Sequence, residues 1–199
     1  ISFIPNYHSF IVIGLITLFY SYTDYLLDKK YQGPYYIIHS INNALIVLCS
    51  CLDVFSISMN PYRAFEYSST VTISSNLTYG LHFYHMIMYT KKLRFDDWLH
   101  HGLMIFVALP IGNYFGPTKL LSNSLFYTTG LPGMIDYGCM ALVRNKKMGR
   151  LTEKNINRYL NAYIRNPGCT IHTFITIINM IALFTRSPFL PDEILNNPI

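Results

Sequence analysis

Charged residues are scarce in this sequence. Asp, Glu, Lys and Arg make up 13% of the 199 residues, whereas a soluble domain usually carries about 25%. Hydrophobic residues make up 51%, and they lie in long stretches with almost no charge, between which the basic residues gather. This pattern is typical of a protein that crosses a membrane several times, and it excludes an ordinary soluble domain.

Several sequence signatures of catalysis and binding are also absent. The chain has no Gly-x-Ser-x-Gly nucleophile elbow and no phosphate-binding loop. No nucleic-acid-binding motif accompanies the net charge of +5, so we expect no nucleic-acid partner. Cys49 and Cys51 lie in an apolar stretch, and their spacing fits no zinc site. We interpret them as apolar filler in a buried helix.

The start of the sequence carries no targeting signal. No basic segment and no small-residue cleavage site precede the first apolar stretch, so we expect no cleavable signal peptide. The first residue is Ile1 rather than Met. We therefore expect the natural protein to extend upstream, with room for one more span.

Six stretches are long enough to cross a bilayer core, which takes about 20 helical residues. They lie at residues 9–27, 35–58, 70–89, 98–115, 121–143 and 169–185. The sequence thus predicts an all-α fold, a polytopic bundle of transmembrane helices that forms one domain over residues 1–199. The third stretch is rich in Ser and Thr, which suits a helix that faces other helices. Gly130, Pro132 and Gly133 predict a kink or break in the fifth.

The basic residues predict the orientation of the chain. Of the 15 Lys and Arg, 12 lie in the first, third and fifth loops between the predicted spans. Cytoplasmic loops carry such an excess, so these three loops are expected in the cytoplasm and both visible chain ends on the other side. The fifth loop, from Arg144 to Arg165, is expected to lie as a loop on the anionic cytoplasmic leaflet.

Ionisable residues inside a span are costly and mark candidate functional sites. His82 and His85 are three residues apart, so they share one face of the third helix. His100 and His101 enter the fourth helix at a similar depth, and Asp136 lies about two turns before the cytoplasmic end of the fifth. We predict that these groups converge in one cavity in the cytoplasmic half. The alternative is a polar knot that only holds the helices together.

The details of this predicted cavity follow from helix geometry. Adjacent residues point about 100° apart on a helix, so only one of His100 and His101 is expected to face any single partner. The carboxylate of Asp136 would orient an imidazole and fix its tautomer. His39 and His172 lie at helix ends, where an amphipathic ring is stable at the membrane interface.

The same histidines also bear on metal binding. The His-x-x-His pair and the following His-His pair resemble histidine-box iron enzymes, but those carry more histidines in longer boxes. Four imidazoles with one acidic residue are a thin ligand set, so we expect no metal. Asp96 and Asp97 precede the fourth helix, where acidic side chains cap free N–H groups.

One segment resembles a known family. Lys91-Lys92-Leu93-Arg94-Phe95-Asp96-Asp97-Trp98-Leu99-His100-His101 resembles the start of the central helix in TLC-domain membrane proteins, which include the ceramide synthases. Those proteins have a basic residue, an acidic residue and then a histidine pair that enters a helix. A later acidic residue is typical, and Asp136 in Gly133-Met134-Ile135-Asp136-Tyr137 could fill that place. The resemblance covers roughly residues 35–185 as a pattern of spans, and about a dozen residues specifically.

This resemblance implies a lipid-related function, either acyl transfer or another lipid modification that uses the histidine pair. It implies membrane lipids and an acyl-CoA as partners and the endoplasmic reticulum as the location. The catalytic residues would be His100, His101 and Asp136. The substrate-binding residues would be His82, His85, Asp96, Asp97 and Tyr137. No cofactor and no oligomeric state follow from it.

Two other classes of function stay open. The first is a non-catalytic protein that binds lipid or organises the membrane. The second is a transporter or channel, although the sequence shows no inverted repeat and no ring of charge.

Overall fold

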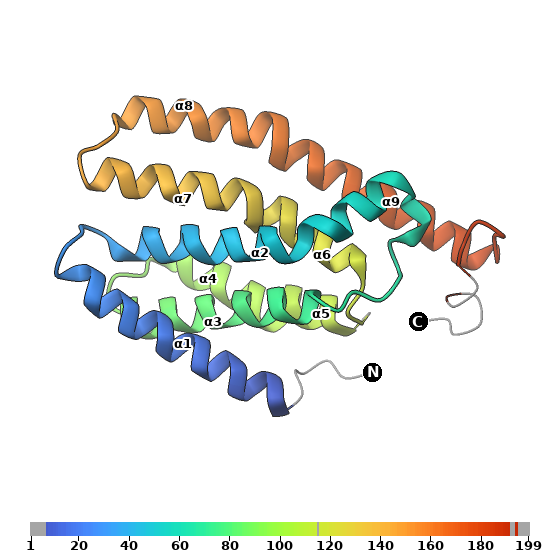
Figure 1. Ribbon diagram of the computed structural model, residues 1–199, viewed down its shortest axis with the longest axis horizontal. Helices are drawn as coiled ribbons and strands as arrows, with labels where there is room; N and C mark the ends of the chain where they lie inside the picture. The colour runs from blue at the N-terminus through green and yellow to red at the C-terminus, as the bar shows by residue number, and fades with distance from the viewer. Residues whose placement is uncertain (1–6, 115, 192–193, 195–199) are drawn as a thin grey trace.

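The structure is a computed structural model that describes residues 7–114, 116–191 and 194. Within these residues, six long helices run side by side and antiparallel (Figure 1). The first three are α1 (Tyr7–Asp28), α2 (Pro34–Met59) and α3 (Val71–Tyr89). The last three are continuous over residues 95–114, 119–144 and 150–184, and each contains a π-helical segment. The all-α prediction is thus confirmed, although the fourth predicted span ends at Phe115, outside the described residues.

Each of the last three helices consists of two α-helical parts joined by a π-helical segment. The fourth helix is α4 (Phe95–Leu103), η2 (Met104–Ala108) and α5 (Leu109–Tyr114). The fifth is α6 (Lys119–Leu125), η3 (Phe126–Gly130) and α7 (Leu131–Arg144). The sixth is α8 (Arg150–Leu160), η4 (Asn161–Arg165) and α9 (Asn166–Phe184).

Each π-helical segment ends two residues before a proline, namely Pro110, Pro132 or Pro167. A proline ring has no N–H and crowds the carbonyl four residues earlier, which here lies inside the π segment. Widening that turn relieves the crowding without breaking the helix. The disturbance predicted around Gly130, Pro132 and Gly133 therefore takes the form of a π-helical segment, not a break.

Three helices are long and apolar enough to cross a membrane. Within the described residues these are His8–Asp28, Pro34–Met59 and Arg150–Phe184. Their outer faces carry large exposed apolar side chains such as Leu18, Leu52 and Phe184, as helices that face lipid require. The chain thus has the character of an integral membrane protein, and the other three spans stay a prediction.

The burial of α3 explains why the third predicted span is less apolar. Nearly all of its residues from Val71 to His85 are buried, and they include Ser74, Asn76 and His82. The helix packs against both α1 and α2 (Figure 1). Because α3 is surrounded by protein, its polar side chains face other helices and need not suit lipid.

The fifth loop was wrongly predicted. Only residues 145–149 are outside helices there, and Arg150–Phe184 forms one helix of 35 residues. The reason is the periodic face of α8, where Glu153 and Leu160 are buried and Asn157 contacts α7. A count of basic residues does not distinguish a loop from a polar helix, and for this reason residues 150–165 were predicted as a loop.

The orientation of the chain can be tested by labelling. The segments 29–33, 90–94 and 145–149 lie at one end of the bundle, at the left of Figure 1, and the segments 60–70 and 116–118 lie at the other. In cells whose plasma membrane alone is permeabilised, a membrane-impermeant maleimide should label Lys147→Cys but not Pro117→Cys. After all membranes are permeabilised both should react, with the native chain as the background. Labelling of both positions before the internal membranes are opened would contradict the predicted topology.

The packing of the sixth helix predicts a stability effect. A methyl group on Gly168 would overlap the base of the Tyr127 ring, including its Cβ at 2.9 Å, and that part of the side chain cannot move aside. We expect Gly168→Ala to destabilise the protein by about 1–3 kcal/mol through overpacking. Thermal unfolding in detergent measures this. The matched control is Gly14→Ala, because nothing lies within 4 Å of a methyl group there; an equal loss in both variants would contradict the account.

Candidate functional site

The bundle encloses a cavity of about 460 Å³ between its helices, within the range of small-molecule sites. Its polar wall comes from α2, α3, α4 and α7, and its apolar wall from α3, η2, α5 and α6. The residues that line it are Tyr35, His39, Asn42, Asn43, Thr78, Leu81, His82, His85, Asp97, His100, His101, Met104, Ala108, Leu109, Leu121, Ser124, Leu125, Thr128, Thr129, Gly133, Tyr137 and Arg165. All three π-helical segments contribute to this wall, as π-helical turns often do at functional sites.

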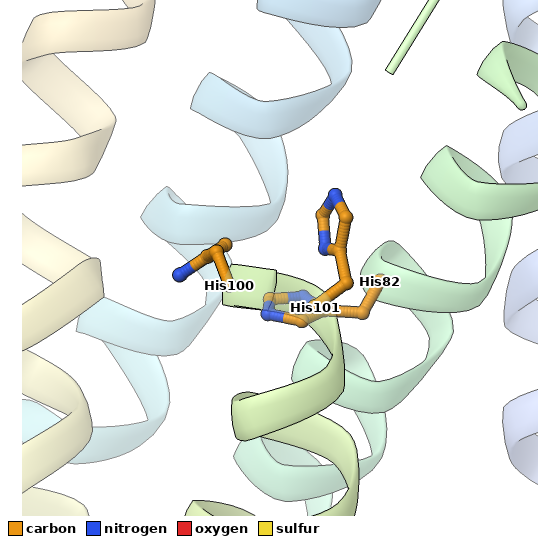
Figure 2. A group of neighbouring side chains, drawn as sticks. All are labelled: His82, His100 and His101. Atoms are coloured by element: carbon orange, nitrogen blue, oxygen red, sulfur yellow. The ribbon is translucent and has the colours of Figure 1, made fainter. Parts of the chain in front are cut away.

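Three histidines form the centre of the site. His82 on α3 and the pair His100 and His101 on α4 each place a ring nitrogen within 4.8 Å of the others (Figure 2). The ring centroid of His82 lies 5.4 Å from that of His100 and 5.0 Å from that of His101. The expectation that only one of the pair could face a given partner was therefore wrong, because α4 crosses α3 closely enough for His82 to contact both rings.

The buried histidines have unpaired nitrogen atoms. Among the described residues, at least one ring nitrogen of His82, together with Nδ1 of His85 and of His101, is buried without a hydrogen-bond partner; the Thr78 backbone carbonyl approaches the other nitrogen of His82. Buried polar groups are normally paired, so such a concentration needs an explanation. The simplest is that the site binds a ligand, water or an ion through these nitrogens, which a polar knot that only holds helices together would not leave free.

The start of α4 fixes the direction of the histidine pair. The backbone N–H of Arg94 donates to Oδ2 of Asp97 at 3.0 Å, and the Arg94 side chain approaches the same carboxylate. These contacts hold the pKa of Asp97 below its ordinary value, so its carboxylate is ionised at neutral pH. Asp97 lies in the first turn of α4 and lines the cavity, whereas Asp96 is exposed and does not. A fixed negative charge thus lies beside the imidazoles.

A second group of rings extends the cluster towards α2 and α7. The Tyr35 ring stacks on His85 with centroids 4.4 Å apart, and the His39 ring lies 4.5 Å from that of Tyr137. The hydroxyls of Tyr35 and Tyr137 are 3.4 Å apart. Sequence reasoning placed His39 at the membrane interface, and it missed Tyr35. The signal was available, because residues 35, 39, 42 and 43 share one helix face and all are polar.

Asp136 was expected in this cavity, but it does not line it. Its Oδ1 accepts a hydrogen bond of 2.6 Å from Asn157 on α8, while the neighbouring Tyr137 lines the cavity. The position of Asp136 along the helix was predicted correctly. The direction of its side chain was predicted wrongly, because adjacent residues point about 100° apart around a helix. The carboxylate in the cavity is that of Asp97 instead. His172 also lies outside it and contacts Asn123.

The chemistry of the histidine cluster fits a metal ion as well as a proton. Three imidazoles are the ligand set of several catalytic zinc sites, which keep a further position open for water or substrate. His82, His100 and His101 would supply it here. The expectation that no metal binds stays a prediction.

A second hollow adjoins the cavity at the loop end of the bundle. Its volume is about 550 Å³, and it shares Tyr35, His85 and Asp97 with the cavity. Its outer wall carries Lys92, Arg94 and Arg144. A positively charged entrance of this kind attracts anionic ligands.

Comparisons with models of protein families, with curated proteins and with solved structures find no match for this chain. The function is therefore inferred from the site.

Proposed function

We propose that this protein is a membrane-embedded enzyme that modifies lipids by acyl transfer. The observation that carries the proposal is the group of unpaired buried imidazole nitrogens in a cavity that is apolar at one end. Imidazole is the side chain best suited to move a proton near neutral pH. The resemblance of residues 91–101 to TLC-domain proteins supports the same reaction class, and the endoplasmic reticulum is the location that it favours.

The proposed step transfers an acyl group from a thioester to a lipid. His101 accepts the proton of an acceptor hydroxyl or amine while that oxygen or nitrogen attacks the acyl carbonyl carbon. The carbon–sulfur bond of the donor then breaks, and the leaving thiolate takes up the proton. The ionised carboxylate of Asp97 stabilises the imidazolium that forms in between. His82 and His100 contact the same ring cluster and position the reacting groups.

The two hollows suit the two parts of an acyl-CoA. Phosphate groups would bind at the entrance, where Lys92, Arg94 and Arg144 lie. The acyl chain would extend past the histidines along Leu109 and Leu121 towards the apolar end. The reacting carbonyl would then lie between the two, beside the histidine cluster.

Lipid mass spectrometry of cells that express the protein tests the proposal. We expect a change in the lipid profile with the native chain, and loss of that change in the His100→Ala/His101→Ala double variant. His172→Ala is the matched control, because His172 lies outside the cavity, and it should behave as the native chain. An unchanged lipid profile, with lipid bound equally by native and variant protein, would instead favour a non-catalytic lipid-binding protein.

The geometry of the three histidines favours a second candidate, a metal-dependent lipid-modifying enzyme. A metal ion on His82, His100 and His101 would activate water or polarise the acyl carbonyl. Elemental analysis of the purified protein separates the two candidates. Stoichiometric zinc or iron that is lost in His82→Ala but kept in His172→Ala would support the metal-dependent reaction; equal metal content in both variants would exclude this site.

A further inference from the structure

An arginine reaches the cavity from the sixth helix. Arg165 is the last residue of η4 and lines the cavity together with the histidines. It is also the last charged residue before the uncharged stretch 166–185. In a membrane that stretch forms the apolar part of the span, so Arg165 lies at its cytoplasmic boundary, near the headgroups of the inner leaflet.

A chain of hydrogen bonds holds this arginine in place. Nη1 of Arg165 donates to Oδ1 of Asn161 at 2.6 Å, Nδ2 of Asn161 donates to Oδ1 of Asn157 at 2.8 Å, and Nδ2 of Asn157 donates to Oδ1 of Asp136 at 2.6 Å. The spacing of four residues puts the three side chains of the sixth helix on one face. Every donor points towards Asp136, so the bonds reinforce one another and fix the guanidinium group.

The guanidinium charge is not neutralised by a direct partner. Among the described residues no carboxylate forms an ion pair with Arg165, and the nearest negative charge in its chain of hydrogen bonds, Asp136, is three bonds away. Its Nε is buried and has no hydrogen-bond partner in the same part of the chain. A cation that is partly withdrawn from water by the protein is costly unless it meets an anion, and a fixed guanidinium edge matches an oxyanion with two parallel hydrogen bonds.

We propose that Arg165 binds an anionic oxygen group of a lipid, a carboxylate or a phosphate, inside the cavity. The inference rests on the proposed function, since it names the lipid class that the histidine site acts on. The charged end of the lipid lies against Arg165 at the wall of the cavity. Asp136 thereby acts as a positioning residue that orients Arg165 from outside the cavity.

Equilibrium binding to the full chain in neutral phosphatidylcholine nanodiscs tests this inference. The probes are oleate, dioleoyl phosphatidic acid, methyl oleate and inorganic phosphate, at a pH that ionises the carboxylate. The native protein should bind at least one anionic lipid about tenfold or more tightly than methyl oleate. Preference for oleate identifies a carboxylate, preference for phosphatidic acid identifies a lipid phosphate, and equally tight binding of inorganic phosphate would overturn the assignment to a lipid.

The variants assign the effect to one side chain. Arg165→Gln should abolish the preference for the anionic lipid, and Arg165→Lys should keep part of it, because the charge remains but the paired hydrogen bonds do not. The matched control is Arg158→Gln, an exposed arginine of the same helix that does not line the cavity. Equal binding by the two glutamine variants would overturn the proposal. If Arg165→Gln does not fold, Arg165→Lys decides, because it keeps the charge: a preference for the anionic lipid as strong as that of the native protein would overturn the proposal.

This assay measures binding and needs no turnover, so its outcome is separate from that of the proposed function. Arg165-dependent binding without a histidine-dependent change of the lipid profile would retain the lipid site and reject the enzyme. A histidine-dependent change without that binding would retain the enzyme and reject the role of Arg165.

Discussion

Purified His101→Ala protein is expected to lose acyl transfer by about 10²- to 10⁴-fold, the range that a positioned general base contributes. His101 is 3% exposed, and its Nδ1 has no partner among the described residues. Its ring lies 5.0 Å from that of His82 and 4.7 Å from that of His85. His85 is also buried beside Asp97, but at 8% exposed it is less enclosed than His101, which lies between His82 and His85.

The measurement is the initial rate of transfer from a labelled acyl-CoA to a lipid acceptor in nanodiscs. His100→Ala should lose about tenfold less activity than His101→Ala, because His100 is exposed and contributes to positioning. His172→Ala serves as the control for a histidine of the sixth helix outside the cavity. A larger loss in His100→Ala than in His101→Ala would contradict the assignment of the base.

The two carboxylates should differ in the kinetic constant that they change. Asp97→Asn is expected to lower kcat about tenfold, which is the loss of about 1.4 kcal/mol of electrostatic stabilisation of the imidazolium. Asp136→Asn should leave kcat within about threefold and raise KM for the anionic lipid, because it loosens Arg165 without removing charge from the cavity. Steady-state kinetics with both substrates varied measures the two effects.

The opposite result would restore the expectation from the sequence. If Asp136→Asn lowered kcat more than Asp97→Asn, the later acidic residue would act in the chemical step, as the resemblance to TLC-domain proteins implies. The unfolding temperatures of both variants serve as the control for a general loss of structure.

Depth was the part of the site that the sequence could predict. Loop positions fix how far each residue lies from the end of its helix, and this brought His82, His85, His100 and His101 to one level. Direction around the helix depends on how each helix packs, and hydropathy does not define it. Asp136 was therefore assigned to the cavity although Tyr137, one residue later, is the side chain that lines it.

The sixth helix shows a second limit of sequence reasoning. Arg165 was counted among the basic residues of a cytoplasmic loop, because a polar helix and a basic loop have the same composition. The pattern that separates them is the repeat of polar side chains every four residues, at Asn157, Asn161 and Arg165. Pro110, Pro132 and Pro167 mark the π-helical segments in the sequence, since each lies two residues after such a segment, and all three segments line the cavity.

The most direct test of the account is transfer of a labelled acyl group by the purified protein. Native protein in nanodiscs with a labelled long-chain acyl-CoA and a membrane lipid extract should yield a labelled lipid, and the His100→Ala/His101→Ala variant should yield none above background. The account is contradicted if the native protein transfers no label while native and variant bind the acyl-CoA equally, because the histidine cavity would then bind lipid without modifying it.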